Sequence, residues 1–201
     1  MFNNKSIILR KGLPEDAPDF ANLTLLSEPE LFPAMFGSGA RNVLQNLFRQ
    51  RRNLFSFEHS YFIEVDGTKV GMILGREKKR REEWRTGLLM IKYMKLEFFA
   101  RIPVLLKTLS LVGRAGDKEY YISSIAVYPE FRGNKLGTTL LLKEEEEAKR
   151  CGAPKSTLDV RVDNQDAIRL YNRLGYLVVG KPRRARNNRK EFASVKMCKK
   201  L

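Results

Sequence analysis

The spacing of apolar and polar residues predicts an alternation of strands and helices over most of the chain. Short β-branched or aromatic runs predict strands, whereas apolar residues three or four positions apart predict amphipathic helices. In the first half, strands are predicted at residues 7–10, 60–65 and 69–74, and helices from Pro14 and over 40–51. In the second half, strands are predicted at 121–127 and 157–160, helices at 136–150 and after Asp163, and a last hairpin at 176–180 and 192–197.

Glycine-containing pairs predict where several of these elements turn or end. Asp66-Gly67 is typical of a type I′ hairpin turn, so the two strands beside it are predicted to pair. Gly152 and Gly175 are predicted to end helices, because glycine adopts the left-handed conformation that closes a last helical turn. Asp163 is predicted to cap the helix that follows it.

The helix at 136–150 and the last hairpin carry strongly charged segments. The helix is predicted to place Leu136, Leu140 and Ala148 toward the core and the acidic run 144–147 in solvent. In the hairpin, the basic residues 183–190 are predicted to form the loop between the two strands.

Residues 76–118 form an insertion that is longer than a connection between strands needs, so we expect it to be helical. Proline is tolerated in the first turn of a helix, so a regular helix is predicted to begin near Ile102 with Pro103 at its first position. We favour packing of its apolar face on the domain's own sheet; the alternatives are a lid over the functional site, a dimer contact or a cationic interfacial helix. The residues of that face are Phe98, Ile102, Leu105, Leu109 and Val112, with Phe99 and Leu106 beside them.

Residues 120–142 carry the clearest chemical signal. An apolar strand ends at Pro129, a turn containing Arg132 and Gly133 follows, and a leucine-rich helix begins at once. This order brings free backbone N–H groups and the positive end of a helix dipole into one small volume, where phosphate binds. The turn matches neither the G-x-x-x-x-G-K-[ST] loop nor the G-x-G-x-x-G fingerprint. A tight connection without a ligand is the plain alternative.

The same segment resembles the acyl-CoA-binding motif of the GNAT superfamily of N-acetyltransferases. The matching residues are Val127, Pro129, Arg132, Gly133 and Gly137. Lys135 stands where the motif has its middle glycine, so it must reach that backbone geometry without glycine's freedom, and its ammonium could contact a phosphate. A second block at 164–176 resembles the family's N-x-x-A-x-x-L-Y-x-x-x-G-[FY] motif, in the family's order and spacing.

The resemblance implies an α/β fold, the acyl-CoA N-acyltransferase fold. This is a mixed, mostly antiparallel central sheet of six to seven strands flanked by helices, and residues 76–118 would be a helical insertion between strands 3 and 4. We expect one GNAT domain over residues 1–201, which ends in a basic hairpin at 181–201.

The resemblance also implies acetyl-CoA as cosubstrate and a set of site residues. Tyr171 is implied as the general acid that protonates the leaving sulfur, although its spacing alone favours a core aromatic. Asn164 is implied to hydrogen-bond the pantetheine chain. The other implied contacts to acetyl-CoA are Ile125, Ala126 and Val127 for the pantetheine and acyl group, and Arg132, Gly133, Asn134, Lys135, Leu136, Gly137 and Thr138 for the diphosphate.

The general base stays open at this point. The central strand offers Glu119, Ser123 and Ser124. The serines are poor bases, Glu119 lies at the strand's start, and a bound water is as good a candidate as any side chain.

Composition adds limits on location and ligands. The chain has 201 residues, two cysteines that are far apart and one histidine, so we expect neither a disulfide framework nor a metal site, and a reducing cytoplasm. No apolar run is long enough for a membrane span, and the N-terminus lacks the apolar core of a signal peptide.

The net charge of +15 lies outside the cofactor motifs. Residues 76–118 hold twelve Lys/Arg against five Asp/Glu, and residues 181–201 hold nine against one. A solvated surface explains such an excess as well as an acidic partner does, such as nucleic acid, a ribonucleoprotein, anionic lipid or an acidic acceptor.

Three functions compete on this evidence. The leading one is a GNAT-type N-acetyltransferase that moves an acetyl group from acetyl-CoA to the primary amine of an unidentified acceptor, by direct attack in a ternary complex. The second is a non-catalytic acyl-CoA-binding module whose basic surface binds a partner. The third is a nucleic-acid-binding protein, for which charge is the one support. A homodimer is left open.

Overall fold

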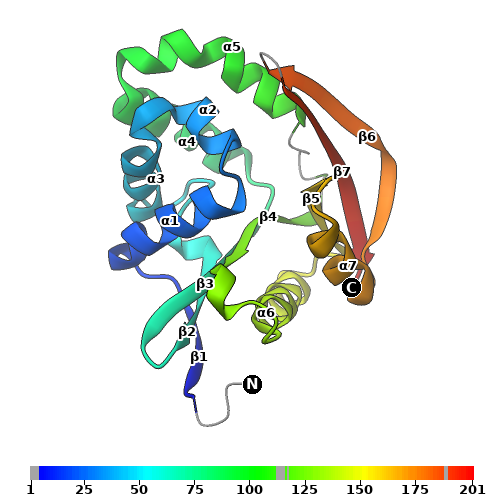
Figure 1. The fold of residues 1–201 in the computed structure, drawn as a ribbon. Coiled ribbons are helices and arrows are strands. Elements are labelled where there is room, and N and C mark those ends of the chain that lie inside the picture. Colours follow the sequence, from blue (N-terminus) through cyan, green and yellow to red (C-terminus); the bar gives the residue numbers. More distant parts are fainter. Residues whose placement is uncertain (1–4, 112–115, 117, 188–189) are drawn as a thin grey trace.

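The computed structural model describes residues 5–111, 116, 118–187 and 190–201 of the 201-residue chain. In these residues seven strands form a sheet of order β1-β2-β3-β4-β5-β7-β6 (Figure 1). The strands are β1 (Ile7–Lys11), β2 (Ser60–Val65), β3 (Thr68–Glu77), β4 (Glu119–Val127), β5 (Lys155–Arg161), β6 (Leu177–Asn187) and β7 (Lys190–Lys200). The α-helices are α1 (Ala17–Ser27), α2 (Leu31–Phe36), α3 (Ala40–Arg49), α4 (Arg80–Met94), α5 (Leu96–Leu111), α6 (Leu136–Arg150) and α7 (Gln165–Arg173).

The sheet is mostly antiparallel, as expected. Within it, β4 and β5 pair in parallel, whereas the pairs β1–β2, β2–β3, β3–β4, β5–β7 and β6–β7 are antiparallel. A parallel pair needs a crossover connection, and α6 supplies it between β4 and β5. The predicted order of strands and helices, including the helical insertion between β3 and β4, is confirmed.

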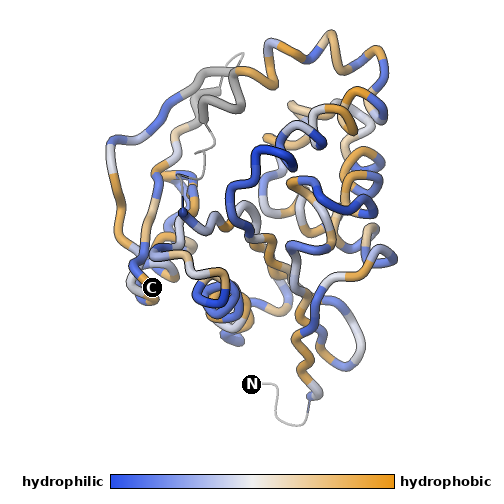
Figure 2. The backbone as a smooth tube through the Cα atoms, turned by 180° about the vertical axis from the view of Figure 1, so that it is seen from behind, coloured by the Kyte–Doolittle hydropathy of each residue, from blue (hydrophilic) through white to orange (hydrophobic). Residues whose placement is uncertain are grey.

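Each face of the sheet carries its own apolar core. On one face α1, α2 and α3 pack with α4 and α5 against side chains such as Phe62, Met72 and Leu74. On the other face α6 and α7 pack against Ile73 and Ile122. Alternation along each strand sends neighbouring side chains to opposite faces, so one strand can serve both cores. Figure 2 shows hydrophobic stretches along the strands at the centre of the molecule, between more hydrophilic helices.

The predicted turns are confirmed where glycine supplies the left-handed backbone. Asp66 and Gly67 have φ angles of 50° and 76°, both positive as a type I′ turn requires. Gly152 and Gly175 have φ angles of 73° and 87° at the ends of α6 and α7.

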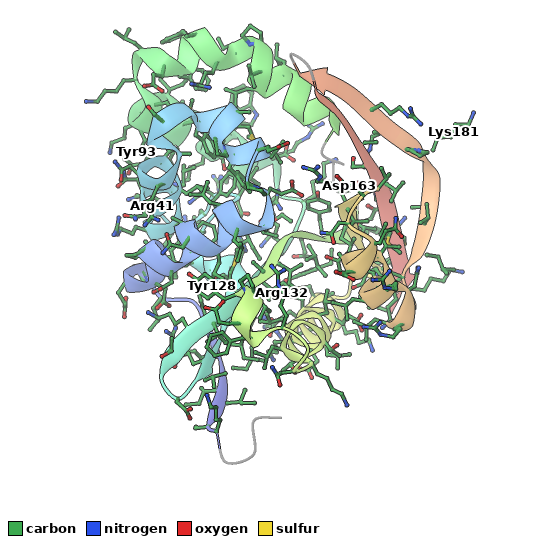
Figure 3. All side chains as sticks on the ribbon, viewed as in Figure 1. Arg41, Tyr93, Tyr128, Arg132, Asp163 and Lys181 are labelled. Atoms are coloured by element: carbon green, nitrogen blue, oxygen red, sulfur yellow. The ribbon has the colours of Figure 1, made fainter. Side chains whose placement is uncertain are left out.

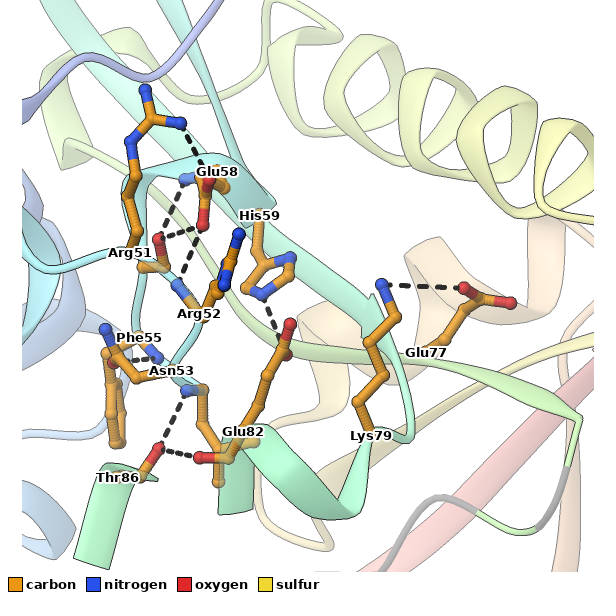
Figure 4. A network of polar contacts seen from close by, with 12 residues as sticks. Arg51, Arg52, Asn53, Phe55, Glu58, His59, Glu77, Lys79, Glu82 and Thr86 are labelled. Carbon is orange, nitrogen blue, oxygen red and sulfur yellow. Dashed lines mark hydrogen bonds and ion pairs between the residues drawn. The ribbon is translucent and has the colours of Figure 1, made fainter. Parts of the chain in front are cut away.

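The insertion is two helices fixed to the rest of the chain by polar contacts. The His59 ring nitrogen Nε2 lies 3.0 Å from the Glu82 carboxylate on α4. The Leu54 amide donates to the Thr86 hydroxyl, and the Arg85 guanidinium donates to the Arg51 carbonyl. Figure 4 shows part of this network around the start of α4.

The predicted start of the second insertion helix is wrong. α5 begins at Leu96, so Pro103 lies inside it and not at its first position. Pro103 is exposed, so water can reach the carbonyl that the missing N–H leaves unbonded, and Phe98 and Leu105 pack inward on either side. The predicted inward face is therefore divided: Phe98 and Leu105 join the core, whereas Phe99, Ile102 and Leu106 are exposed. The side chains of Leu109 and Val112 lie outside the described residues.

Two further expectations about charged segments are wrong. Glu144 and Glu145 are buried, not solvated, because Tyr120 donates to Glu144 and Lys199 pairs with Glu145. The last hairpin is longer than predicted, so Arg183 lies on β6 and not in a loop. The Arg183 guanidinium forms an ion pair with Asp159 on β5. Residues 188 and 189 of the predicted loop lie outside the described residues.

Candidate acyl-CoA and amine site

The site begins where β4 and β5 separate. Their pairing runs from Glu119 opposite Lys155 to Ile122 opposite Leu158 and stops there. Beyond it, Ser124 to Val127 have sheet partners in β3 alone. A register shift in β3–β4 at this point leaves Ser123 as a bulge, and bulges bend a strand. The two strands thus form a fork, and the β5-facing edge of β4 offers main-chain donors and acceptors to a ligand.

Ile125, Ala126 and Val127 lie along this fork, as the family resemblance implies. Ile125 and Val127 belong to the α6–α7 core, whereas Ala126 belongs to the core of the other face. All three are buried or half-buried.

The turn after β4 leads into the N-terminus of α6. The Arg132 guanidinium donates to the Val127 carbonyl, and the Asn134 amide donates to the carbonyls of Phe131 and Arg132. These bonds use side chains to fix the turn, so its main chain is held in place. Figure 3 labels Tyr128 and Arg132 at this turn, and Asp163 at the end of β5.

The backbone N–H groups of this turn are free to receive an anion. Among the described residues, the first hydrogen bond of α6 is from the Thr139 amide to the Lys135 carbonyl, and no bond is found for the amides of residues 133–138. Six such donors at the positive end of a 15-residue helix suit a diphosphate.

Gly133 and Lys135 give the turn its shape. Their φ angles are 80° and 60°, so both adopt the left-handed conformation. Lys135 thus occupies the geometry expected for the motif's glycine, at the cost of about 1 kcal/mol for a residue with a Cβ. Its exposed side chain lies directly before α6. Gly137 contributes through helix packing and not through its backbone conformation. A Cβ there would meet the Leu170 side chain at 3.4 Å, so α6 and α7 approach closely.

Tyr171 lies on α7 and is buried in the same core as Leu136 and Ile125. Its ring packs against that of Tyr176, with centroids 6.1 Å apart. Burial, together with the nearby charge of Glu28, raises the pKa of the Tyr171 phenol, so the group carries its proton at neutral pH.

Asn164 has a structural task that the resemblance did not imply. Its side-chain oxygen accepts from the Ala167 amide, so Asn164 is the N-cap of α7. The predicted cap, Asp163, pairs instead with Arg161 at 2.6 Å. The prediction for Asp163 is wrong by one residue, because an ion pair with β5 competes for its carboxylate.

Glu28 is a candidate site residue that the sequence analysis did not identify. It follows α1, is half-buried and lies close enough to Tyr171 to affect that phenol. Burial raises the pKa of Glu28 to about 7, which the charge of Arg161 opposes and those of Asp163 and Glu30 reinforce. A carboxyl group with this pKa can accept a proton from an amine at neutral pH.

Glu119 forms ion pairs at the end of the fork where β4 and β5 are still paired. It lies 2.8 Å from Lys155 and 2.6 Å from Lys196, and hydrogen bonds from these ammonium groups outweigh its burial and lower its pKa to about 2. Such a carboxylate is a weak base. Ser123 donates to the Leu74 carbonyl and so supports the bulge.

Arg76 is a cationic residue with one buried, unbonded nitrogen on the sheet face that also carries Ser124. Its guanidinium lies 5.7 Å above the Tyr121 ring, and its Nη1 is buried without a hydrogen-bond partner. Burial lowers its pKa, and nearby Tyr121 and Glu82 oppose that effect. An unpaired buried donor is costly, so this position suits an anionic group of a ligand.

The described residues contain no group of three or more His, Cys, Asp or Glu side chains that could hold a metal ion. No helix among them is long and apolar enough to cross a bilayer.

Comparisons with known proteins agree with this geometry. The profile described as "Acetyltransferase (GNAT) family" matches residues 27–176. An N-alpha-acetyltransferase of Sulfurisphaera tokodaii is 28% identical over 174 residues, which cover 86% of this chain and 81% of that protein. An aminoalkylphosphonate N-acetyltransferase of Salmonella typhimurium is 42% identical over 55 residues, or 27% of this chain and 36% of that protein. The second match thus spans about a third of its relative.

A solved structure of a protein from Salmonella typhimurium with its cofactor acetyl-CoA has the same fold. Its TM-score is 0.63 at 16% identity, and the match covers 97% of this chain and 94% of that chain.

Proposed function

Because the chain belongs to the GNAT acetyltransferase family, we propose that it transfers an acetyl group from acetyl-CoA to a primary amine by direct attack in a ternary complex. The observation that carries this proposal is the β4–β5 fork, which opens beside the free amides at the start of α6. The fork fits a pantetheine chain paired along β4, and the amides of residues 133–138 fit the diphosphate.

The transfer needs one proton to leave the amine and one to reach the sulfur. The amine nitrogen attacks the thioester carbonyl carbon, the C–S bond breaks, and the products are an amide and free CoA. Glu28, with a pKa of about 7, is the base that takes the amine proton. Tyr171 is protonated at neutral pH and donates to the departing sulfur. A main-chain N–H of β4 polarises the acyl oxygen.

We propose the N-terminal amine of a polypeptide as the acceptor class to test first. The relative from Sulfurisphaera tokodaii is named for that acceptor, and a match of 174 residues must include both halves of this chain. Because the Nη1 atom of Arg76 is buried without a hydrogen-bond partner, we further propose that the acceptor carries an acidic group near its amine. Peptides with Asp or Glu at the second position should therefore react faster than matched peptides with Lys there.

Tyr171→Phe tests the catalytic proposal directly. Loss of the phenolic proton is expected to lower turnover of acetyl-CoA by about a hundredfold, because general acid catalysis contributes roughly that much. Binding of CoA, measured by calorimetry, is expected to stay within about twofold of the parent.

The same variant separates the enzyme from a non-catalytic acyl-CoA-binding module. A module predicts no turnover with any amine in the parent chain, together with intact CoA binding. Equal turnover by parent and Tyr171→Phe would remove Tyr171 from the mechanism but leave the fork as the binding site.

A further inference from the structure

The two helices of the insertion expose an apolar face that no part of the described chain covers. On α4, Trp84, Leu88 and Ile91 are 77%, 65% and 41% exposed. On α5, Leu96, Phe99 and Leu106 are 86%, 60% and 63% exposed. Scattered apolar side chains are ordinary on a surface, but six on two consecutive helices are not. We call these six residues the insertion face.

The spacing shows that this face is separate from the one that packs inward. Trp84, Leu88 and Ile91 recur four and three positions apart and so share one side of α4, whereas Leu89 and Met94 are buried. On α5, Phe98 and Leu105 turn inward from the exposed Leu96, Phe99 and Leu106. Packing of the insertion on the domain therefore does not account for the second apolar face.

The helix α5, which carries half of the insertion face, lies at the outer border of the molecule (Figure 1). α5 runs along the outer border of the helical layer, from α4 toward the β6–β7 hairpin (Figure 1). The main contacts of α5 are with α2, α4 and β6. Exposed apolar helix faces bordered by basic residues can lie in the headgroup layer of a membrane.

Cations border the apolar residues. Arg81, Arg85 and Lys92 on α4 and Lys95 between the helices are exposed, and the exposed acids beside them are Glu83 and Glu97. Long basic side chains around Trp, Leu and Phe are typical of helices that lie in the headgroup layer of anionic membranes. A symmetric pair of copies would instead bring the same cations against each other.

We propose that the insertion face docks the protein on anionic lipid bilayers, with α4 and α5 lying in the headgroup layer. Trp84, Leu88, Leu96 and Phe99 enter the acyl boundary, and the basic side chains contact lipid phosphates. The protein is thereby held at a membrane surface without crossing it. The proposal does not depend on the acetyl transfer proposed above.

Trp84 makes the test direct, because it is the chain's single tryptophan. The full-length protein is mixed with vesicles of phosphatidylcholine containing phosphatidylglycerol, or of phosphatidylcholine alone. With anionic vesicles we expect a blue shift of Trp84 emission and co-flotation of the protein. With neutral vesicles we expect at least tenfold weaker binding, because each cation near an anionic surface adds roughly fivefold.

Variants assign the effect to the insertion face. Leu96→Asp and Phe99→Asp are expected to lower anionic-vesicle binding by at least tenfold. Leu177→Asp is the matched control, since Leu177 is 68% exposed on β6, away from this face, and it should bind as the parent does. Unchanged acetyl-CoA binding, or an unchanged unfolding curve, shows that each variant is folded.

Three results would overturn the proposal. One is the absence of a blue shift and of flotation at millimolar anionic lipid. Another is equal loss of vesicle binding in Leu177→Asp. The third is a dimer in sedimentation experiments that Leu96→Asp dissociates, or binding of RNA that Leu96→Asp abolishes, which would assign the face to that partner instead.

Discussion

Glu28 shows how the fold changes the chemistry of one residue. In the sequence it is one of the two acids that flank Pro29, with no feature that distinguishes it. In the structure its burial beside Tyr171 raises its pKa to about 7, with Arg161 as the opposing charge. The signal that would have identified it is the packing of the end of α1 over β5, which no local pattern encodes.

This environment predicts the pH dependence of the reaction. A base acts only when it is unprotonated, so kcat/KM is expected to rise with pH and level off above about 7. Glu28→Gln should lower kcat/KM by about a hundredfold and remove that limb. Glu30→Gln changes the neighbouring acid and is the control. In this variant kcat/KM should still rise with pH as in the parent. A limb that persists in Glu28→Gln would assign the titration to the acceptor amine.

Lys135 can be tested with two substitutions at the same position. Lys135→Gly relieves the left-handed backbone and is expected to raise the free energy of unfolding by about 0.5–1 kcal/mol, whereas Lys135→Ala should not raise it. Both variants lose the ammonium group, so both should bind CoA about three- to tenfold more weakly. Unchanged affinity in both would show that the ammonium does not contact the diphosphate.

At the scale of elements, the sequence was most informative where a residue acts on its own backbone. Asp66-Gly67, Gly152 and Gly175 specify their turns locally, and the block around Gly133 specifies the α6 N-terminus. It was least informative where tertiary contacts decide. Glu144 and Glu145 look solvated in an acidic run, and their burial depends on Tyr120 and Lys199, from other elements.

Pro103 is a second case in which context outweighs local preference. α5 continues through it because inward packing on both sides holds the helix. Pro103→Ala restores one N–H and is expected to raise the free energy of unfolding by about 1–3 kcal/mol in urea denaturation. Gly87→Ala on α4 is the companion variant, because a Cβ there meets nothing within 4 Å. It is expected to raise the free energy of unfolding by about 1 kcal/mol. Destabilisation by Pro103→Ala would mean that α5 needs a bend there.

At the scale of the whole molecule, the proposed catalytic pair joins the two halves of the chain. Glu28 belongs to the first half and Tyr171 to the second, and only the folded chain brings Glu28 close enough to affect the Tyr171 phenol. The proposed acyl-CoA contacts therefore come from motifs in the sequence, whereas the proposed base comes from the fold. The identity of the acceptor and a cytoplasmic location stay predictions.

Buried Glu144 should make the stability of the whole chain depend on pH. Burial raises its pKa from 4.5 to about 8, so the folded chain holds a proton that the unfolded chain releases. The stabilising contribution of this group is thus full below about 4.5 and is lost as pH rises through 8. Relative to the parent, Glu144→Gln is expected to gain about 1–3 kcal/mol in free energy of unfolding between pH 5 and pH 8.5.

Urea denaturation at both pH values measures this difference. Glu146→Gln is the matched control, because the Glu146 side chain is 70% exposed and should show no such gain. Parallel pH curves for the parent and Glu144→Gln would mean that water or Lys11 keeps Glu144 ionised.

The fork also bears on the tendency of the protein to aggregate. Unsatisfied strand edges usually invite fibril growth, because another polypeptide can add itself to them. Here the unsatisfied stretch from Ser124 to Val127 is recessed between two helical layers, with each residue buried or half-buried. This edge of β4 is therefore less open to the addition of a strand from another chain than an edge at the border of a sheet.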